Sequence, residues 1–270
     1  MNVIEANGAR IPGIGLGTMT LKGEVCIEAV KTALQLGYRH IDTAQNYGNE
    51  REVGEGIRVS GVKREDVFLT TKIYWNRLGE FERAVDESLK TLGFSSVDLL
   101  LIHWANPQIP VAQSVTTLCT FKKKGLARHV GVANFTAAML DEAVKVATEP
   151  LVTNQIEVHP FLDQSKVIAA CRTHGLSVTA YCPLARGKIK DDTLDRIGKA
   201  HGKSGPQVAL RYLVQQGIIP IPRTANPGHL AANLAVFDFN LRGGEMAEIG
   251  KLGRAGMRVV NPPHAPKWDS

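Results

Sequence analysis

Short apolar runs recur along the whole chain and alternate with stretches that have a helical hydrophobic period. Several runs are nearly continuous in Val, Ile and Leu, as in VDLLLIHW at residues 97–104. Runs of this length and composition predict strands buried on both faces of a parallel sheet. The predicted strands are Gly13–Thr18, His40–Ala44, Val67–Ile73, Val97–Trp104, His129–Asn134, Thr153–Val158, Leu176–Tyr181 and Ile218–Pro222.

The stretches between these strands predict amphipathic helices. In Glu24–Gln35 the apolar residues fall on one helical face, and Gly37 follows as a stop signal. The other predicted helices are Phe81–Leu92, Thr136–Val146, Ser165–His174, Asp191–Ala200 and Pro206–Gln216.

Strands that alternate with helices in this way predict an α/β fold, a (β/α)8 TIM barrel. A doubly wound Rossmann sheet is the alternative, but the Gly-rich stretch at residues 13–17 lacks the GxGxxG spacing. Residues 1–12 predict a β-hairpin with its turn at Asn7-Gly8, placed to plug the bottom of the barrel. No linker interrupts the chain, so we expect residues 1–270 to form a single domain.

The composition is that of a globular protein. Of the 270 residues, 44% are hydrophobic and 21% charged, which excludes an intrinsically disordered chain. No stretch has the roughly 18 apolar residues of a spanning helix, and the first residues lack a signal-peptide pattern, so we expect a cytoplasmic protein with no membrane partner. The net charge is +6, but the basic residues are scattered, and we expect no nucleic-acid partner.

The cysteines and histidines predict no metal site. Cys26, Cys119, Cys171 and Cys182 have no CxxC spacing and are interpreted as reduced thiols. The eight histidines are dispersed, with no HxH or HxxxH pair. Four of them are interpreted as surface or loop residues: His159, His174, His201 and His264.

Polar residues at the ends of neighbouring predicted strands supply the candidate chemistry. In a (β/α)8 barrel the active site lies where strands end and βα loops begin. Asp42, Tyr47, Lys72 and His103 would all reach that mouth. A lysine ammonium near a tyrosine lowers its pKa, a carboxylate keeps the lysine charged, and an imidazole can bond a carbonyl oxygen. Such a group can protonate a developing alkoxide, while the hydride must come from a nicotinamide cofactor.

Ordered motifs make this interpretation specific. GYRHIDTAQNYGNE at residues 37–50 is followed by Thr70–Lys72, Leu101–Trp104, Gly131–Phe135, Asn154-Gln155 and Tyr181–Leu184. With these motifs the chain resembles the aldo-keto reductases over almost its whole length. The resemblance implies a catalytic tetrad of Asp42, Tyr47, Lys72 and His103. The ending at Ala265–Asp269, without a long C-terminal extension, resembles the short bacterial members of the family.

The resemblance also implies a set of cofactor-binding residues. Asn134 and Gln155 would hold the nicotinamide carboxamide, and Tyr181 would stack under the nicotinamide ring. Gly17, Thr18 and Leu184 would lie along the cofactor backbone and its pyrophosphate.

The segment that would bind the 2′-phosphate departs from the family pattern. Arg223 and Thr224 stand where the family has a Lys-Ser pair, His229 stands where an arginine is usual, and Asn233 matches. Because Arg223 still offers a forked cation, we predict NADPH as cofactor, with NADH as a tolerated second choice.

The substrate pocket is expected to be open and polar. Met19, Trp75 and Trp104 would form its walls. We expect small-molecule carbonyl substrates: small aldehydes, α-dicarbonyls such as methylglyoxal, and keto-sugar acids such as 2,5-diketo-D-gluconate. The expected product is an alcohol, with Tyr47 as the proton donor. We expect a monomer.

Two other functions are compatible with the same fold. The first is a cofactor-sensing regulatory subunit with slow turnover, because a fold does not determine function. The second is a phosphosugar isomerase, for which Glu157 is the only candidate catalytic carboxylate.

Overall fold

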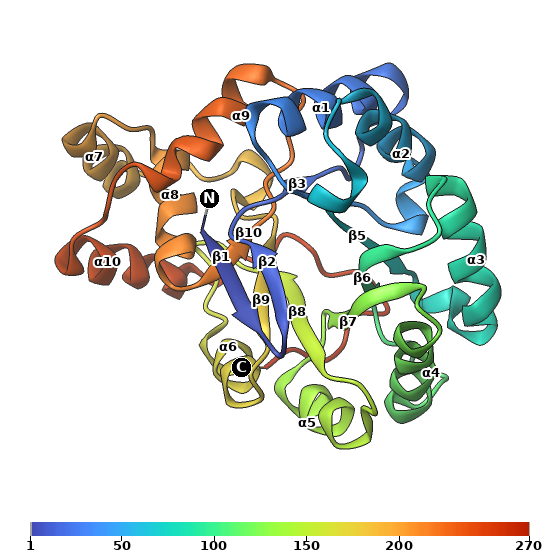
Figure 1. Ribbon diagram of the computed structural model, residues 1–270. Coiled ribbons are helices and arrows are strands. Elements are labelled where there is room, and N and C mark those ends of the chain that lie inside the picture. The colour runs from blue at the N-terminus through green and yellow to red at the C-terminus, as the bar shows by residue number, and fades with distance from the viewer. Residues whose placement is uncertain (1, 270) are drawn as a thin grey trace.

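A parallel eight-stranded sheet forms the centre of the computed structural model, which describes residues 2–269. Its neighbouring strands follow chain order, and helices surround them (Figure 1). The strands are β3 (Leu16–Gly17), β4 (His40–Asp42), β5 (Phe68–Ile73), β6 (Val97–Ile102), β7 (Ala127–Ala133), β8 (Leu151–Glu157), β9 (Ser177–Tyr181) and β10 (Ile218–Pro220).

Backbone hydrogen bonds between the first and last strand regions close the sheet. The N–H of Gly15 donates to the carbonyl of Pro220 at 3.0 Å, and the N–H of Gly17 donates to that of Pro222 at 3.2 Å. A side chain at Gly17 would place its Cβ 2.7 Å from the carbonyl oxygen of Ile221, so the two strands approach closely there. The predicted (β/α)8 barrel is confirmed.

The helices alternate with the strands on the outside of the barrel (Figure 1). The six predicted helices form with small shifts at their ends, whereas α2, α4, α9 and α10 are not among the helices predicted from the sequence. The helices are α1 (Gly23–Leu36), α2 (Glu50–Val59), α3 (Phe81–Leu92), α4 (Val111–Lys123), α5 (Ala137–Val146), α6 (Ser165–Thr173), α7 (Asp192–His201), α8 (Gly205–Gln215), α9 (Pro227–Leu234) and α10 (Gly243–Gly250). No helix in residues 2–269 is long and apolar enough to cross a membrane.

Two glycines show how the sequence fixes the outer layer. Gly37 ends α1 with φ 111°, a left-handed conformation that glycine adopts without steric cost. Gly54 in α2 lies against α3, and a Cβ there would be 2.0 Å from the carbonyl oxygen of Leu92. The second position therefore allows the two helices to pack at close range.

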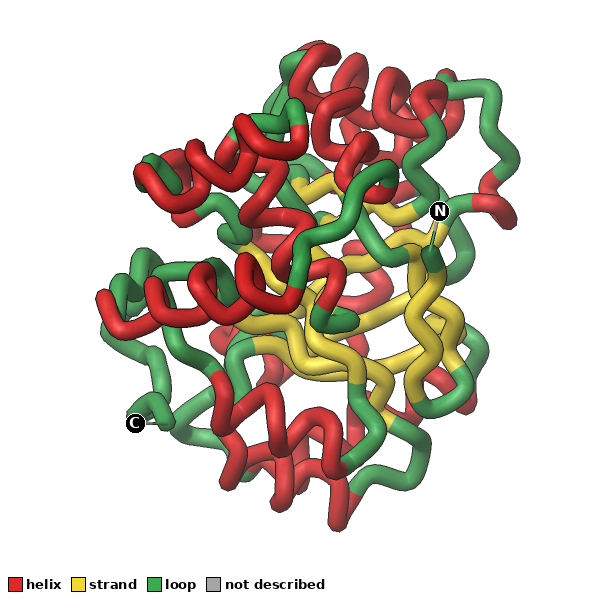
Figure 2. Tube along the Cα trace, turned by 90° about the vertical axis from the view of Figure 1, so that its left-hand side faces the viewer, coloured by secondary structure: helices red, strands yellow, loops and turns green. Residues whose placement is uncertain are grey.

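The predicted N-terminal hairpin is confirmed. Strand β1 (Val3–Ala6) pairs antiparallel with β2 (Ala9–Pro12). Ala9 and Ile11 of the hairpin are buried in one cluster with inward-facing residues of the barrel, namely Leu99, Leu101, Ala133, Val152 and Ile219. The hairpin therefore fills one end of the barrel, and the two chain termini lie on opposite sides of the molecule (Figure 2).

Strand β6 shows how the alternation of side chains divides the core. Leu99 and Leu101 point into the barrel, whereas Leu100 and Ile102 belong to the cluster between the strands and the helices. Both clusters are apolar, so the strand is buried on both faces. The polar residues Asp42, Lys72 and His103 lie at the carboxyl ends of β4, β5 and β6.

Candidate active site

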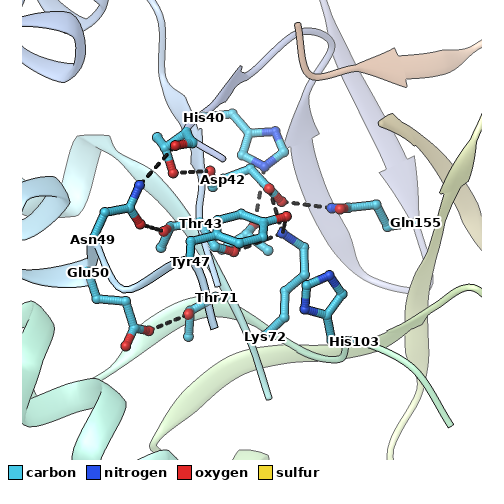
Figure 3. A network of polar contacts seen from close by, with 12 residues as sticks. His40, Asp42, Thr43, Tyr47, Asn49, Glu50, Thr71, Lys72, His103 and Gln155 are labelled. Carbon is cyan, nitrogen blue, oxygen red and sulfur yellow. Dashed lines mark hydrogen bonds and ion pairs between the residues drawn. The ribbon is translucent and has the colours of Figure 1, made fainter. Parts of the chain in front are cut away.

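Four residues of the sequence-predicted tetrad meet at this end of the barrel (Figure 3). Asp42 is the last residue of β4, and Tyr47 ends the short 3-10 helix η1 (Gln45–Tyr47) that follows. Lys72 is near the end of β5, and His103 directly follows β6. Since these strands are adjacent in a parallel sheet, their last residues converge at one edge.

A buried ion pair joins two members of the tetrad. The Lys72 Nζ lies 2.5 Å from Asp42 Oδ1, and both side chains are at most 1% exposed. The same ammonium donates to the carbonyl of Thr43 at 2.8 Å and lies 3.5 Å from the Tyr47 hydroxyl. The second Asp42 oxygen accepts a hydrogen bond from Gln155 Nε2 at 2.7 Å. Asp42 is therefore satisfied on both oxygens, and Lys72 is held beneath the tyrosine hydroxyl.

The environment of Tyr47 keeps its hydroxyl protonated. Burial raises the pKa of Tyr47 well above its usual value, and the Asp42 carboxylate adds to the shift. Lys72 was expected to lower this pKa, but the structure gives the opposite direction. The reason is that burial disfavours the charged phenolate, and the Asp42 carboxylate adds a second unfavourable charge.

His103 presents a neutral imidazole beside the tyrosine. Its ring centroid is 5.7 Å from that of Tyr47, in an edge-on arrangement. Burial lowers the pKa of His103 well below its usual value, and the Lys72 charge acts in the same direction. The imidazole is therefore uncharged near neutral pH and offers one N–H and one acceptor nitrogen.

Two residues outside the predicted set hold the Tyr47 loop in place. The Asn49 side chain accepts from Thr43 Oγ1 at 2.8 Å and donates to the carbonyls of Thr18 and Leu21 at 2.8 and 3.0 Å. The Lys22 ammonium donates to the backbone carbonyls of Tyr47 and Gly48. Hydrophobic periodicity does not indicate contacts between a side chain and the backbone, so the sequence analysis did not identify Asn49 or Lys22.

The residues predicted to hold the nicotinamide are linked to the tetrad. Asn134 has a left-handed φ of 62°, and its amide donates to the His103 carbonyl at 2.9 Å. Its side-chain oxygen accepts from the Tyr181 hydroxyl at 2.7 Å. Gln155 binds Asp42 as described, and the Thr18 hydroxyl donates to the Asp42 carbonyl at 3.0 Å. The structure therefore brings these residues together around one opening.

The residues predicted to bind the 2′-phosphate fall into two groups. Arg223, Thr224 and His229 lie after β10 and at the start of α9, where Arg223 and His229 are exposed and Thr224 is half-buried. Asn233 lies one turn further on, is only 6% exposed and packs beside the Tyr38 hydroxyl. The structure therefore places Asn233 apart from the exposed group.

The positive charges near Tyr181 fit a dinucleotide phosphate cofactor. Cys182 directly follows Tyr181 in the chain. Both Arg186 and Arg223 lie close enough to its thiol for their positive charges to act against the rise in its pKa. Neither guanidinium forms an ion pair with an acidic side chain in residues 2–269. Guanidinium groups without a protein counter-charge match the anionic phosphates of NADP(H). Leu184 lies in the same loop and is half-buried.

The predicted aromatic walls surround a loop histidine to which the sequence analysis gave no role in the site. Trp75 and Trp104 each lie next to His264, at ring-centroid distances of 5.1 and 5.2 Å. Met19 is half-buried in the loop after β3. His264 is a half-buried loop residue, as predicted, but its loop belongs to the C-terminal segment and returns to the mouth of the barrel.

His159, predicted to be a surface or loop residue, lies in the loop after β8 but is buried, and its contact involves Glu157. The His159 Nε2 lies 3.0 Å from a Glu157 oxygen, and both side chains are fully buried. The Glu157 carboxylate also accepts the N–H groups of Val259 and Val260, at 2.6 and 2.8 Å. Its oxygens are committed to these partners, which argues against Glu157 as an isomerase base.

Neither a disulfide nor a metal centre contributes to the described part of the chain. The four cysteines are free thiols, and Cys182 is the one that is not fully buried. Within residues 2–269, no group of three or more His, Cys, Asp or Glu side chains could hold a metal ion.

The family is decided by a match that covers nearly all of the barrel. The sequence model of the aldo/keto reductase family matches residues 13–254. The chain belongs to the aldo/keto reductase family. Like the family, this aldo/keto reductase is an oxidoreductase that acts on carbonyl compounds, and aldo/keto reductases use NADP(H).

Individual relatives cover almost the whole length of this aldo/keto reductase. It is 40% identical to methylglyoxal reductase DkgB of Salmonella typhi over 266 residues, which are 96% of this chain and 99% of the relative. Morphine 6-dehydrogenase of Pseudomonas putida is 37% identical over 280 residues, covering 95% and 92% of the two chains.

Solved structures agree with these relatives. A protein provisionally assigned as a 2,5-diketo-D-gluconic acid reductase B superposes with a TM-score of 0.97 at 45% identity, covering 100% of this chain and 98% of the other. A Bombyx mori aldo-keto reductase in complex with NADP superposes with a TM-score of 0.89 at 35% identity, covering 96% and 94%.

Proposed function

We propose that this aldo/keto reductase uses NADPH to reduce small aldehydes and α-dicarbonyl compounds to alcohols, with Tyr47 as the proton donor. The observation that carries the proposal is the contact of the Tyr47 hydroxyl with the buried Lys72–Asp42 ion pair. The similarity to a methylglyoxal reductase and to a diketogluconate reductase fold supports methylglyoxal and keto-sugar acids such as 2,5-diketo-D-gluconate as substrates.

The tyrosine hydroxyl acts as the acid. Because its pKa is raised, Tyr47 carries its proton at neutral pH and donates a hydrogen bond to the substrate carbonyl oxygen. NADPH, when bound, would supply the hydride that the carbonyl carbon needs. As negative charge develops on the carbonyl oxygen, Tyr47 passes its proton to that oxygen, and the nearby Lys72 ammonium stabilises the phenolate that remains.

His103 orients the substrate. Its lowered pKa leaves the imidazole neutral, so it directs an N–H or an acceptor nitrogen without placing a second cation beside Lys72. The edge-on contact with Tyr47 brings both groups to one side of the mouth. The carbonyl oxygen would lie between the tyrosine hydroxyl and the imidazole.

Residues around the same opening would hold the cofactor. Asn134, Gln155 and Tyr181 would contact the nicotinamide, with Gly17, Thr18 and Leu184 along the remainder of the molecule. Arg223, Thr224 and His229 would face the 2′-phosphate, which supports NADPH as the preferred cofactor. Asn233 is proposed only as a residue that supports this segment, because it is buried.

Substitution of Tyr47 by phenylalanine tests the proposal. Tyr47→Phe removes the donated proton, and we expect kcat for methylglyoxal to fall about 10²–10⁴-fold with NADPH binding unchanged. Tyr212→Phe, on α8 and outside the mouth, is the matched control and should keep wild-type kcat. A Tyr47→Phe variant with more than a tenth of wild-type kcat would refute the role of Tyr47.

The wild-type protein itself decides between reductase and sensor. NADPH consumption is followed with methylglyoxal, 2,5-diketo-D-gluconate and a nitrobenzaldehyde. Tight NADPH binding without turnover of any of these would favour the slow-turnover regulatory subunit.

A further inference from the structure

The C-terminal segment, residues 257–269, is fixed to the barrel at its start. The N–H of Met257 donates to the carbonyl of Phe161 at 2.9 Å. The next two contacts are the hydrogen bonds from Val259 and Val260 to the fully buried Glu157 carboxylate. A buried carboxylate that accepts two backbone N–H groups makes strong, charge-assisted hydrogen bonds. These hydrogen bonds therefore fix the start of the C-terminal segment against the end of β8.

The far end of the C-terminal segment is fixed as well. The Asp269 carboxylate accepts the N–H of Ala137 at 2.9 Å. The Trp268 ring packs against Trp104 at 5.9 Å, and the Arg258 guanidinium lies 3.9 Å from the Trp268 ring centroid. The segment thus folds back on itself, and the residues between its two attachments lie over the mouth of the barrel.

His264 lies between the two attachments and reaches the aromatic residues of the mouth. Its ring centroid is 5.5 Å from that of Tyr74, in addition to the contacts with Trp75 and Trp104. Tyr74 in turn lies 5.4 Å from His103. Tyr74 therefore contacts both histidines, and His264 is the imidazole that the C-terminal segment brings to the mouth.

The hydrogen bonds of His264 leave one polar atom available. Its Nε2 lies 3.2 Å from the Tyr74 hydroxyl, whereas its Nδ1 has no hydrogen-bond partner in the described part of the chain. Burial lowers the pKa of His264, which leaves the ring neutral at pH 7. Nδ1 is then a donor when Tyr74 donates to Nε2, or an acceptor when it does not. In both states His264 offers a hydrogen bond within otherwise aromatic surroundings.

We propose that His264 is a specificity-determining residue that hydrogen-bonds the oxygen substituent next to the reacting carbonyl group of the substrate. The inference rests on the proposed reductase function and adds a substrate class to it. It favours carbonyl compounds with a hydroxyl or a second carbonyl on the α-carbon over simple alkyl aldehydes. His103 and Tyr47 hydrogen-bond the reacting carbonyl oxygen, and His264 hydrogen-bonds the oxygen on the adjacent carbon.

Two three-carbon aldehydes separate this role from a packing role. Glyceraldehyde carries hydroxyl groups and propanal carries none, so only the first can use the proposed hydrogen bond. His264→Phe keeps an aromatic ring in the cluster and removes the polar nitrogens, whereas His264→Gln keeps a polar side chain and removes the ring. His174→Phe is the matched control, because His174 lies beside Asp141 at the end of α6.

We expect His264→Phe to raise KM for glyceraldehyde about tenfold, the loss of roughly one hydrogen bond, and to change kcat/KM for propanal less than twofold. His264→Gln should recover most of the preference for glyceraldehyde, and His174→Phe should match the wild type. Equal changes for both aldehydes in His264→Phe, or no change for either, would overturn the inference while leaving the reductase function intact. Absence of turnover in the wild-type protein would instead refute the reductase function, and the inference with it.

Discussion

The Asp42–Lys72 pair offers the sharpest test of how the site is built. Asp42→Asn keeps the shape of the side chain and removes its charge. Lys72, which is 0% exposed, then has no carboxylate partner at 2.5 Å. In the wild type Gln155 Nε2 donates to Asp42 Oδ2, so the amide of the variant must also face this donor. One amide must therefore reorient to avoid two facing donors.

The expected cost follows from the burial of both groups. Removing one partner of a buried ion pair leaves an uncompensated charge and typically destabilises a protein by about 3–5 kcal/mol. For a chain of this size each kcal/mol lowers Tm by roughly 2–4 °C. We therefore expect Asp42→Asn to melt about 6–20 °C below the wild type at pH 7.

The deficit should depend on pH in a defined direction. Burial already lowers the pKa of Lys72, and Asp42 is the main group that opposes this shift. Without Asp42 the pKa falls further below the unfolded value of about 10.4. At pH values under the folded pKa the full penalty for a buried charge applies. As pH rises from the folded pKa of the variant towards the folded pKa of the wild type, Lys72 loses its proton in the folded variant but keeps it in the folded wild type. The deficit therefore shrinks over this interval, by up to about 1.4 kcal/mol per pH unit.

Urea denaturation at pH 7 and at pH 9 measures both effects, with Asp98→Asn as the matched control. Asp98 is a buried carboxylate at the start of β6 that pairs with Arg64 and Arg128 at 2.7 and 3.1 Å. Arginine does not titrate in this range, so the deficit of Asp98→Asn should not shrink at pH 9. An Asp42→Asn protein as stable as the wild type, or one whose deficit is the same at both pH values, would refute the reasoning.

Two further substitutions probe the packing and the cofactor. Gly54→Ala should lose about 3 kcal/mol in urea denaturation, because its Cβ would overlap the Leu92 carbonyl oxygen. Gly79→Ala, where a Cβ meets no atom within 4 Å, should stay within about 0.5 kcal/mol of the wild type, and equal losses would contradict the close packing of α2 and α3. Arg223→Ala should raise KM for NADPH about tenfold or more and leave KM for NADH nearly unchanged in steady-state assays, because only NADPH carries the 2′-phosphate. Unchanged NADPH affinity would exclude Arg223 from that contact.

The sequence predicted the part of the site that strand ends determine. Asp42, Lys72 and His103 each stand at the last positions of a strongly apolar run, so the barrel fixes where they lie. The N-terminal hairpin was predicted for a similar reason, since Asn7-Gly8 is a strong turn signal between two short apolar runs. The missed helix α2 carries charged residues and two glycines in EREVGEGIRV, which hide its apolar face.

The parts of the site that were missed depend on contacts with a distant segment whose sequence has no regular hydrophobic period. His264 is far from His103 in the chain and lies in an irregular, proline-containing segment, where no period indicates a direction. Glu157 was considered as a catalytic base because it ends a strand in the same way as the tetrad residues. Its actual partners are backbone N–H groups of the C-terminal segment, and sequence patterns do not encode such pairings.

The closure of the barrel has a consequence for how the chain is made. Gly15 and Gly17 bond to Pro220 and Pro222, and Ile11 packs in the cluster that contains Ile219. The hairpin and β3 therefore leave the ribosome well before β10 and the residues just after it, which hold these partners. At about 5–20 residues per second, the hairpin waits roughly 10–40 s for them. Until Ile219 is made, the cluster that the hairpin joins lacks its last member, so the apolar side chains at this end of the barrel are only partly covered during translation.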